Sequence, residues 1–505
     1  MVNSLMNAIW AQYLKLHRSQ IRQFSNYPID TQWQQLDTIL RRARNTEWGK
    51  RYKFGEITSV KQWQDRLPLQ DYESLKEDIF RMMRDEKDIL WPGRTKYFAK
   101  SSGTTADKSK FIPITDENHE DCHVKGGWRS VAIMYENLED PRIVEGKTMV
   151  IPGSTVHDLE GYLGSIVGDV SAVILQRTPL IAQQRLFPPL EIALMSNFEE
   201  KLEIMVRTGV QEDIRMVAGS PTWALVLFKK VLEYTGKQNI LEVWPNMQIF
   251  VHGAVSFIPY KAVFAEFFPD PKFAYQEIYN ATEGYFGVQS DYGTEDMLLI
   301  LDNSIYYEFV PMEEWDKEDP KTILLQDVEL NKHYALIITT NAGLFRYQIG
   351  DTVMFTCLLP YKIKVTGRTK QFINAFGEEV MVSNTDKALQ ETAEQFQVQV
   401  SDYTVAPIFQ SRDGKGGHEW IIEFQDADPD REAFAEALDK KLQTINSDYE
   451  AKRFCDMAMK RLVLHIAPKN TFMQWLRQKN KVSAQQKVPR LSNHRIHLEE
   501  ILQIL

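Results

Sequence analysis

The sequence predicts an α/β protein in two parts, a large N-terminal domain of mixed β-sheets flanked by helices and a smaller α+β C-terminal domain. Apolar segments of strand length alternate with segments of helical periodicity between residues 97 and 380. Two strand segments, 247–251 and 273–279, run into small or polar turns, where α/β proteins place ligands. Near residue 368 the pattern changes to that of a small α+β unit, so we expect domains at 1–368 and 369–505.

The N-terminal region is predicted to be helical. Apolar side chains recur at helical spacing through residues 3–45, with a break around Asn26-Tyr27-Pro28. Residues 60–84 are expected to form helical pieces that Pro68 interrupts. Two apolar runs, 97–99 and 111–114, then flank a small-residue loop, which predicts a β-hairpin.

The remaining elements follow from the same two periodicities. In the large domain we expect helices over residues 116–138, 189–208, 221–235 and 259–268, and further strands over 298–310 and 333–341. In the small domain we expect a helix at 430–444 and strands at 401–409, 419–424 and 461–466.

Composition and charge exclude several classes of protein. The net charge of −10 argues against a dedicated binder of nucleic acid or of an anionic membrane surface. Three scattered cysteines, Cys122, Cys357 and Cys455, fit a reducing compartment without a disulfide framework. Nothing in the sequence resembles a signal peptide or a membrane-spanning run of roughly 20 apolar residues, so the cytoplasm is the expected location.

The loop of the hairpin has the chemistry of an anion-binding site. Its small residues, Ser101 to Thr105, offer hydroxyl donors, and Gly103 lets the backbone N–H groups turn toward one point. Lys108 and Lys110 add charges that suit phosphate. The spacing is not that of a Walker A loop. The alternative is an ordinary Ser/Thr/Gly turn.

Three more residues could contribute to the same chemistry. Tyr279 precedes a polar turn and could stack on a base, and Glu283 in that turn is a carboxylate where a hard cation could bind. Asp351 follows a glycine at a strand end and could accept both hydroxyls of a ribose. The alternatives are a solvent-exposed loop carboxylate for Glu283 and a simple turn residue for Asp351.

The segment His119-Glu120-Asp121-Cys122-His123 fits the His-Glu-x-x-His pattern of zinc peptidases. His119 and His123 would bind zinc, with Glu120 as general base. The third histidine of the longer pattern is replaced by Arg129, a cation that would repel zinc. A third ligand could still come from Glu136, Glu139 or Glu145. The alternative is a polar helix with two solvated histidines.

Taken together and in order, these motifs resemble those of the adenylate-forming superfamily, which includes acyl-CoA synthetases and luciferase. The chain is most similar to the Gretchen Hagen (auxin-responsive) family of acyl-acid amido synthetases. The resemblance lies in RARNTEWGKRYKF, SSGTTADKSKFIP, FVHGAVSFIPY, YNATE and GLFRYQIGD, and it spans about residues 30–490. It implies an ATP-dependent ligase that adenylates a carboxylic acid and transfers the acyl group to an amino acid.

The resemblance also implies roles for individual residues. The ATP phosphates would be held by the hairpin loop and its lysine, that is, by Ser101, Ser102, Gly103, Thr104, Thr105 and Lys110. Gly253 and Ala254 would border the adenine, and Tyr279 would stack on it. Thr282 would touch the α-phosphate, and Glu283 would bind Mg²⁺.

The other implied residues lie later in the chain. Asp351 would hold the ribose, and Arg368 would lie close to the nucleotide. Thr369 and Lys370 would form a hinge, across which the small domain would bring Lys487 into the site. Ala106 and Asp107 depart from the family's usual glycines, so the loop conformation stays open.

Three alternatives stay open. One is a ligase of the same superfamily that forms an acyl-CoA or another thioester, and a more distant one is the zinc peptidase. The weakest is a degenerate, non-enzymatic nucleotide-binding protein. As partners we expect a small carboxylic acid and an amine, with no nucleic acid or membrane, and a monomer as the oligomeric state.

Overall fold

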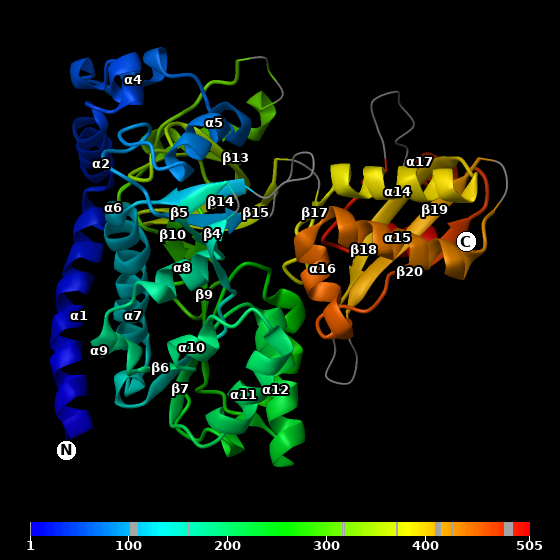
Figure 1. Cartoon of the computed structure of the whole chain (residues 1–505), viewed down its shortest axis with the longest axis horizontal. Helices are drawn as coiled ribbons and strands as arrows, with labels where there is room; N and C mark the ends of the chain where they lie inside the picture. Colours follow the sequence, from blue (N-terminus) through cyan, green and yellow to red (C-terminus); the bar gives the residue numbers. More distant parts are fainter. Residues whose placement is uncertain are drawn as a thin grey trace.

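The structure is a computed structural model, shown in Figure 1. It describes residues 2–101, 110–159, 161–315, 317, 319–369, 372–409, 416–425, 428–478 and 488–505. The elements up to β15 form a large part, and the elements from β16 onward form a smaller part beside it (Figure 1). The mixed α/β architecture with a smaller C-terminal α+β part agrees with the fold class that the sequence predicts.

The N-terminal helices begin and end where the sequence indicates. Helix α1 (Val2–Asn26) runs along one side of the large part, and α2 (Pro28–Ala43) follows after a single residue. Pro28 is the first residue of α2, where the missing N–H costs nothing. The two pieces expected around Pro68 are α4 (Val60–Arg66) and α5 (Tyr72–Met83).

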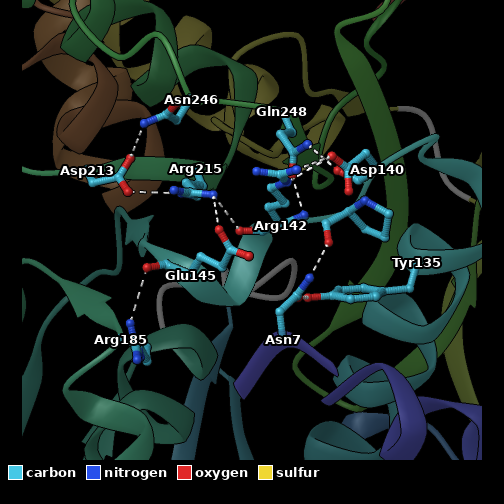
Figure 2. Close-up of polar contacts among 11 residues, drawn as sticks. Asn7, Tyr135, Asp140, Arg142, Glu145, Arg185, Asp213, Arg215, Asn246 and Gln248 are labelled. Carbon is cyan, nitrogen blue, oxygen red and sulfur yellow. Dashed lines mark hydrogen bonds and ion pairs between the residues drawn. The ribbon is translucent and has the colours of Figure 1, made fainter. Parts of the chain in front are cut away.

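Polar contacts hold α1 against the rest of the large part, as Figure 2 shows. The Asn7 amide donates to the Pro141 carbonyl oxygen, and the Tyr135 hydroxyl donates to Asn7. Farther along, the Arg129 guanidinium, fully buried, pairs with Asp302 and donates to His17 of α1. Arg129 is therefore a structural residue that fixes α1.

The central sheet is mixed, and its strands come from most of the large part. Within the described residues it has eleven strands in the order β12-β13-β14-β15-β11-β10-β9-β8-β7-β3-β6. The strands from β9 to β6 pair in parallel, and the others pair antiparallel. The bounds are β3 Lys147–Val150, β6 Leu186–Phe187, β7 Ile214–Ala218, β8 Ile249–His252, β9 Ala274–Ala281, β10 Gly284–Val288, β11 Met297–Leu299, β12 Ile305–Pro311, β13 His333–Thr340, β14 Tyr347–Leu358 and β15 Tyr361–Arg368.

The predicted hairpin belongs to a second sheet. Strands β1 (Tyr97–Ser101) and β2 (Lys110–Ile114) pair antiparallel, so Ser101 and Lys110 lie opposite each other at its end. Strands β4 (Thr155–Leu159) and β5 (Tyr162–Gly168) complete this sheet. The loop residues 102–109 lie outside the described part of the chain.

Helices cover the parallel strands and bury a large aromatic core. They include α7 (Lys125–Asn137), α8 (Val170–Gln176), α11 (Phe198–Gly209), α12 (Pro221–Thr235) and α13 (Lys261–Phe267). In the core beneath α12 and α13, Phe228, Phe250 and Phe264 are fully buried with rings 4.9–6.2 Å apart. Such rings bury much apolar area, which fixes these helices on the sheet.

The smaller part has a sheet and a core of its own. Strands β18 (Val400–Ile408), β19 (Gly417–Phe424) and β20 (Val463–Ala467) form the sheet, and α14 (Val382–Phe396) and α15 (Arg431–Ile445) pack on it. The other elements are β16 (Phe372–Ile373), β17 (Val380–Met381), α16 (Ser447–Arg453), α17 (Thr471–Gln478) and α18 (Ile496–Leu502). The domain boundary at 368–369 stays a prediction. Among the described residues, no helix combines the length and apolar character that crossing a membrane requires.

Candidate active site

A large cavity lies between the central sheet and the smaller part. Its volume is about 1900 Å³, which exceeds the 300–1,000 Å³ typical of small-molecule sites. The residues after β8, the strand β9 and its turn, and the facing ends of β14 and β15 form one wall. Residues 372–379 and 493–496 of the smaller part form the other. A ligand here would therefore contact both parts of the chain.

The turn after β9 brings two of the predicted residues to this cavity. Ala281 and Gly284 are paired across the antiparallel strands β9 and β10, so Thr282 and Glu283 form a two-residue turn that connects them. Both turn residues line the cavity, and Glu283 is only 6% exposed. The alternative of a solvent-exposed loop carboxylate is therefore wrong for Glu283.

Burial and charge set the ionisation of Glu283. The pKa of the Glu283 carboxyl is raised to about 7, mainly by burial and also by the Asp351 charge, against the lowering effect of Lys110 and Arg368. A carboxylate in such surroundings gains stability from an added cation, because opposite charge favours the ionised form. The influence of Lys110 also means that the base of the β1–β2 hairpin lies close to this carboxylate.

Asp351 and Arg368 occupy opposite positions on the neighbouring strands β14 and β15. The Arg368 Nε donates to Asp351 Oδ1 at 2.9 Å, and the Tyr279 hydroxyl donates to Asp351 Oδ2 at 2.6 Å. Arg368 also approaches Glu379 of the smaller part at 3.5 Å. Gly350, at φ +94°, provides the left-handed backbone that turns the strand before Asp351. The carboxylate of Asp351 is thus held on both oxygens, which is more than a simple turn residue requires.

The backbone after β8 is closely packed, which accounts for the small residues at the predicted adenine site. A Cβ on Gly253 would lie 2.5 Å from the Ile278 carbonyl oxygen, so only glycine fits there. Ala254 has φ +71°, which is strained for a residue with a side chain. Its carbonyl accepts a hydrogen bond of 3.2 Å from the Asn374 amide of the smaller part. The close packing leaves the backbone itself as the cavity wall.

Several predicted residues cannot be placed. Ser102, Gly103, Thr104, Thr105 and Lys487 lie outside the described residues, and for Ser101 only the backbone is described, as the last residue of β1. Glu283, Thr282, Tyr279, Ala254, Asp351 and Arg368 all line one cavity, with Gly253 beside them and Lys110 close to Glu283.

The His-Glu-x-x-His segment forms no metal site with the described residues. No group of three His, Cys, Asp or Glu side chains among them could hold a metal ion. The three proposed third ligands, Glu136, Glu139 and Glu145, each lie in an ion pair, with Arg22, Lys272 and Arg215. The interpretation as two solvated histidines is also wrong, because His119 and His123 are 1% and 3% exposed. They belong to a π-helical segment, His119–Val124.

Sequence reasoning missed the contributions of Asn374 and Glu379. Both lie in the segment FINAFGEEV, which carries no spacing pattern of a known site. It also gave no role to Arg346 of GLFRYQIGD. This guanidinium is 6% exposed and makes two hydrogen bonds of 3.1 Å to the buried Glu308 carboxylate, and a further one to the Gln64 carbonyl oxygen. Arg346 therefore stabilises the fold.

Comparison with known proteins gives consistent matches along the chain. Sequence profiles of the GH3 family match residues 17–158 and 155–273 (N-terminal domain), 298–368 (central domain) and 383–496 (C-terminal domain). Indole-3-acetic acid-amido synthetase GH3.4 of Arabidopsis thaliana is 23% identical over 90% of this chain and 87% of its own length.

Two solved structures are similar in fold. One is the acyl acid amido synthetase AtGH3.15 in complex with 2,4-DB, with a TM-score of 0.63, 16% identity and coverage of 98% of this chain and 96% of that one. The other is 2-hydroxyisobutyryl-CoA ligase in complex with 2-HIB-AMP and CoA, with a TM-score of 0.57, 13% identity and coverage of 95% and 93%.

Proposed function

This chain belongs to the GH3 family, and we propose that it is an ATP-dependent ligase that joins a carboxylic acid to the amine of an amino acid. In the first step, a carboxylate oxygen attacks the α-phosphorus of ATP, and pyrophosphate leaves. In the second step, the amine nitrogen attacks the carbonyl carbon of the acyl-adenylate, and AMP leaves with the bridging oxygen. The amine loses one proton as the amide forms.

The cavity residues suit the nucleotide in this reaction. Asp351 would accept the ribose hydroxyls, since a carboxylate has acceptor positions beyond the two used by Tyr279 and Arg368. Gly253 and Ala254 would border the adenine with backbone, and Tyr279 would contact the base. Thr282 would donate to the α-phosphate.

The phosphates would lie toward the β1–β2 hairpin. Ser101 to Thr105 and Lys110 would hold them, and the proximity of Lys110 to Glu283 supports this direction. Lys487 would be the lysine that the small domain delivers, across a hinge at Thr369 and Lys370. These roles stay predictions, and they share one mechanism: hydrogen-bond donors and cations would stabilise the charge on the transferring group.

Glu283 fits a magnesium site. Its carboxylate is buried on the cavity wall, and carboxylates are the ligands with which proteins hold Mg²⁺ beside phosphates. When bound, Mg²⁺ supplies neutralisation of charge on the phosphate oxygens. Glu283 itself would orient the triphosphate for attack by the acid.

The single observation that carries the proposal is the meeting of Glu283, Asp351 and Arg368 on one cavity in a chain that belongs to this family. Glu283 lies in the turn after β9, and the other two lie in β14 and β15. Glu283 and Arg368 are 85 residues apart in the sequence. A fold that served only packing would not require two carboxylates and a guanidinium on the wall of one cavity.

The test is a screen for pyrophosphate release with ATP, Mg²⁺ and a panel of carboxylic acids. Acids that respond are then incubated with the twenty amino acids, and the products are identified by mass spectrometry. We expect an amide and AMP without any requirement for CoA. If no acid in the panel supports pyrophosphate release, the proposal is wrong.

The thioester-forming ligase is the second candidate, because a CoA ligase shares the fold. The same screen separates the two: an acyl-CoA product formed in preference to any amide would favour it. Cytoplasmic location and a monomeric state stay predictions.

A further inference from the structure

Apolar side chains from both parts of the chain line the cavity. Ile258 of the large part and Ile496 of the smaller part are 62% and 63% exposed there. Phe409, half-buried and directly after β18, lines the cavity as well. Arg495 donates to the Pro407 carbonyl oxygen at 2.8 Å, so the end of β18 lies beside the start of α18. Single exposed apolar residues are ordinary, but several on one cavity mark a binding surface, here called the apolar wall (Ile258, Ile496 and Phe409).

Hydrogen bonds between the two parts bring the apolar wall together. The side-chain amide of Asn374 donates to the Ala254 carbonyl oxygen at 3.2 Å, and its backbone N–H donates to Asn493 Oδ1 at 2.7 Å. Ile258 follows Ala254 by four residues, and Ile496 follows Asn493 by three. The apolar wall therefore adjoins the contact between the two parts.

The same contact leads to the predicted ribose site. Asn374 Oδ1 accepts a hydrogen bond of 3.4 Å from the backbone N–H of Glu379. The Glu379 carboxylate in turn lies 3.5 Å from the Arg368 guanidinium, which holds Asp351. In the proposed reaction, the amine meets the acyl group beside the nucleotide. A substrate that contacts the apolar wall would therefore lie close to the reacting atoms.

The charges of the cavity favour a ligand without an added negative charge. Among the described residues, every lysine and arginine that lines the cavity pairs with a carboxylate, at nitrogen–oxygen distances of 2.6–3.4 Å; these are Lys261, Lys272, Lys364, Arg368 and Arg495. Glu277 also lines the cavity, and its carboxylate forms no ion pair within 4 Å in the described part of the chain. An extra carboxylate on a ligand would thus find like charge and no lysine or arginine of this lining without a partner.

We propose that the amine acceptor of this chain is an amino acid with an uncharged, apolar side chain, which packs against Ile258, Ile496 and Phe409. The inference rests on the proposed function and names the class of its second substrate. Aspartate and glutamate are disfavoured because their second carboxylate is not matched by a cation. The α-carboxylate is common to all amino acids, so it does not affect the comparison.

The experiment uses the full-length protein, ATP, Mg²⁺, an acid that passes the screen, and amino acids matched in shape. Leucine is compared with asparagine and aspartate, methionine with glutamine and glutamate, and valine with threonine. The readout is kcat/KM for amide formation, followed by mass spectrometry. We expect the apolar member of at least one set to be favoured by about tenfold or more over each polar member.

Ile258→Asn and Ile496→Asn test the apolar wall. Each replaces an exposed apolar side chain by a polar one, so the preference for the apolar amino acid should fall by about threefold or more. Leu180→Asn is the matched control, since Leu180 is 78% exposed and lies outside the lining of the cavity. It should keep the wild-type preference within about twofold. Each preference is a ratio within one protein, so a general loss of activity cancels.

The outcomes separate this inference from the proposed function. If no amino acid gives an amide, the proposed function fails and this inference fails with it. If amides form but the apolar member is favoured less than tenfold in every set, only this inference is wrong, and the wild-type protein alone decides this. Unchanged preferences in both folded variants would also contradict it. If the variants instead change the selectivity among acids in pyrophosphate release, the apolar wall contacts the acid and the inference is wrong.

Discussion

At the residue scale, the site depends on how a few buried charges are held. Asp351 is fixed by Tyr279 and Arg368, and Glu283 lies where Lys110, Asp351 and Arg368 all act on it. The sequence pointed to each of these residues individually, through glycine-aspartate at a strand end and Thr-Glu in a polar turn. It did not reveal that Asp351 and Tyr279 share a hydrogen bond, because three strands separate β14 from β9 in the sheet.

Asp351→Asn tests whether the Asp351 carboxylate holds the ribose. An asparagine has no charge and one acceptor oxygen, so it can accept from Arg368 only if its amide donates to the Tyr279 hydroxyl, and an acceptor for the ribose is lost. We expect kcat/KM for acid-dependent pyrophosphate release to fall by about 100-fold. Tyr279→Phe, which removes one hydroxyl and keeps the ring, should lower the same kcat/KM by only about tenfold. Wild-type rates in Asp351→Asn would contradict the assignment.

His252 provides a pH test that is independent of activity. It is 2% exposed, stacks on Phe257 at 4.0 Å, and burial lowers its pKa to about 3. Below the unfolded pKa of about 6.5 the unfolded chain takes up a proton that the folded chain refuses, so stability is lost as pH falls. Between pH 7.5 and 5, the free energy of unfolding of His252→Phe should therefore fall by about 2 kcal/mol less than that of the wild type.

The measurement is urea unfolding of both proteins at the two pH values. The comparison isolates His252, since every other titrating group is common to the two. An identical pH dependence of the two unfolding free energies would show that His252 is not held neutral by burial.

At the element scale, strand and helix periodicities located most of the fold. The hairpin β1–β2, the strand β9 and the helices around Pro68 lie where expected, whereas strand β10 directly after the β9 turn was not predicted. The π-helical segment 119–124 was not predictable from the sequence. Its form depends on tertiary contacts, such as the backbone N–H of Tyr285 donating to Cys122 Sγ at 3.3 Å and the contact of His123 with Asn280.

Arg346 shows why a motif residue need not touch the ligand. It joins the loop before β14 to Glu308 of β12 and to carbonyl oxygens around α4. Arg346→Ala would leave the Glu308 carboxylate, 1% exposed, without its guanidinium. We expect a loss of about 3–5 kcal/mol in the free energy of unfolding, because an uncompensated buried charge is costly.

Urea unfolding at pH 7.5 checks this prediction. Arg41→Ala is the matched control, since Arg41 pairs with Asp37 on the surface of α2 with 76% of its side chain exposed. It should change stability by less than about 0.5 kcal/mol. Equal effects of the two substitutions would mean that the Arg346–Glu308 pair does not stabilise the fold.

At the scale of the whole molecule, the cavity is shared between two parts of the chain. The Tyr260 hydroxyl donates to the Ala375 carbonyl oxygen at 2.7 Å, and Lys452 Nζ lies 4.5 Å from the centre of the Trp223 ring. With Asn374 and Glu379, these contacts connect the smaller part to the cavity wall. The sequence indicated a second domain but none of these contacts, because each joins residues from segments without a recognisable pattern.

Lys487 tests whether the small domain takes part in the chemistry. It lies outside the described residues, and its assignment comes from the family resemblance alone. A lysine that acts on the transferring phosphate should matter for the reaction and little for nucleotide binding. Lys487→Ala should lower the rate of adenylation by about 100-fold and change the Kd for ATP by less than about threefold. Equal losses in both quantities would contradict a domain-delivered lysine.

The proposed reaction requires that a carboxylate oxygen of the acid bonds to the α-phosphorus of ATP. An acid that passes the screen is prepared with both carboxylate oxygens as ¹⁸O and incubated with ATP, Mg²⁺ and the amino acid, and the nucleotide product is analysed by mass spectrometry. We expect AMP carrying one ¹⁸O, with unlabelled pyrophosphate. Label in inorganic phosphate, with ADP as the nucleotide product, would contradict it.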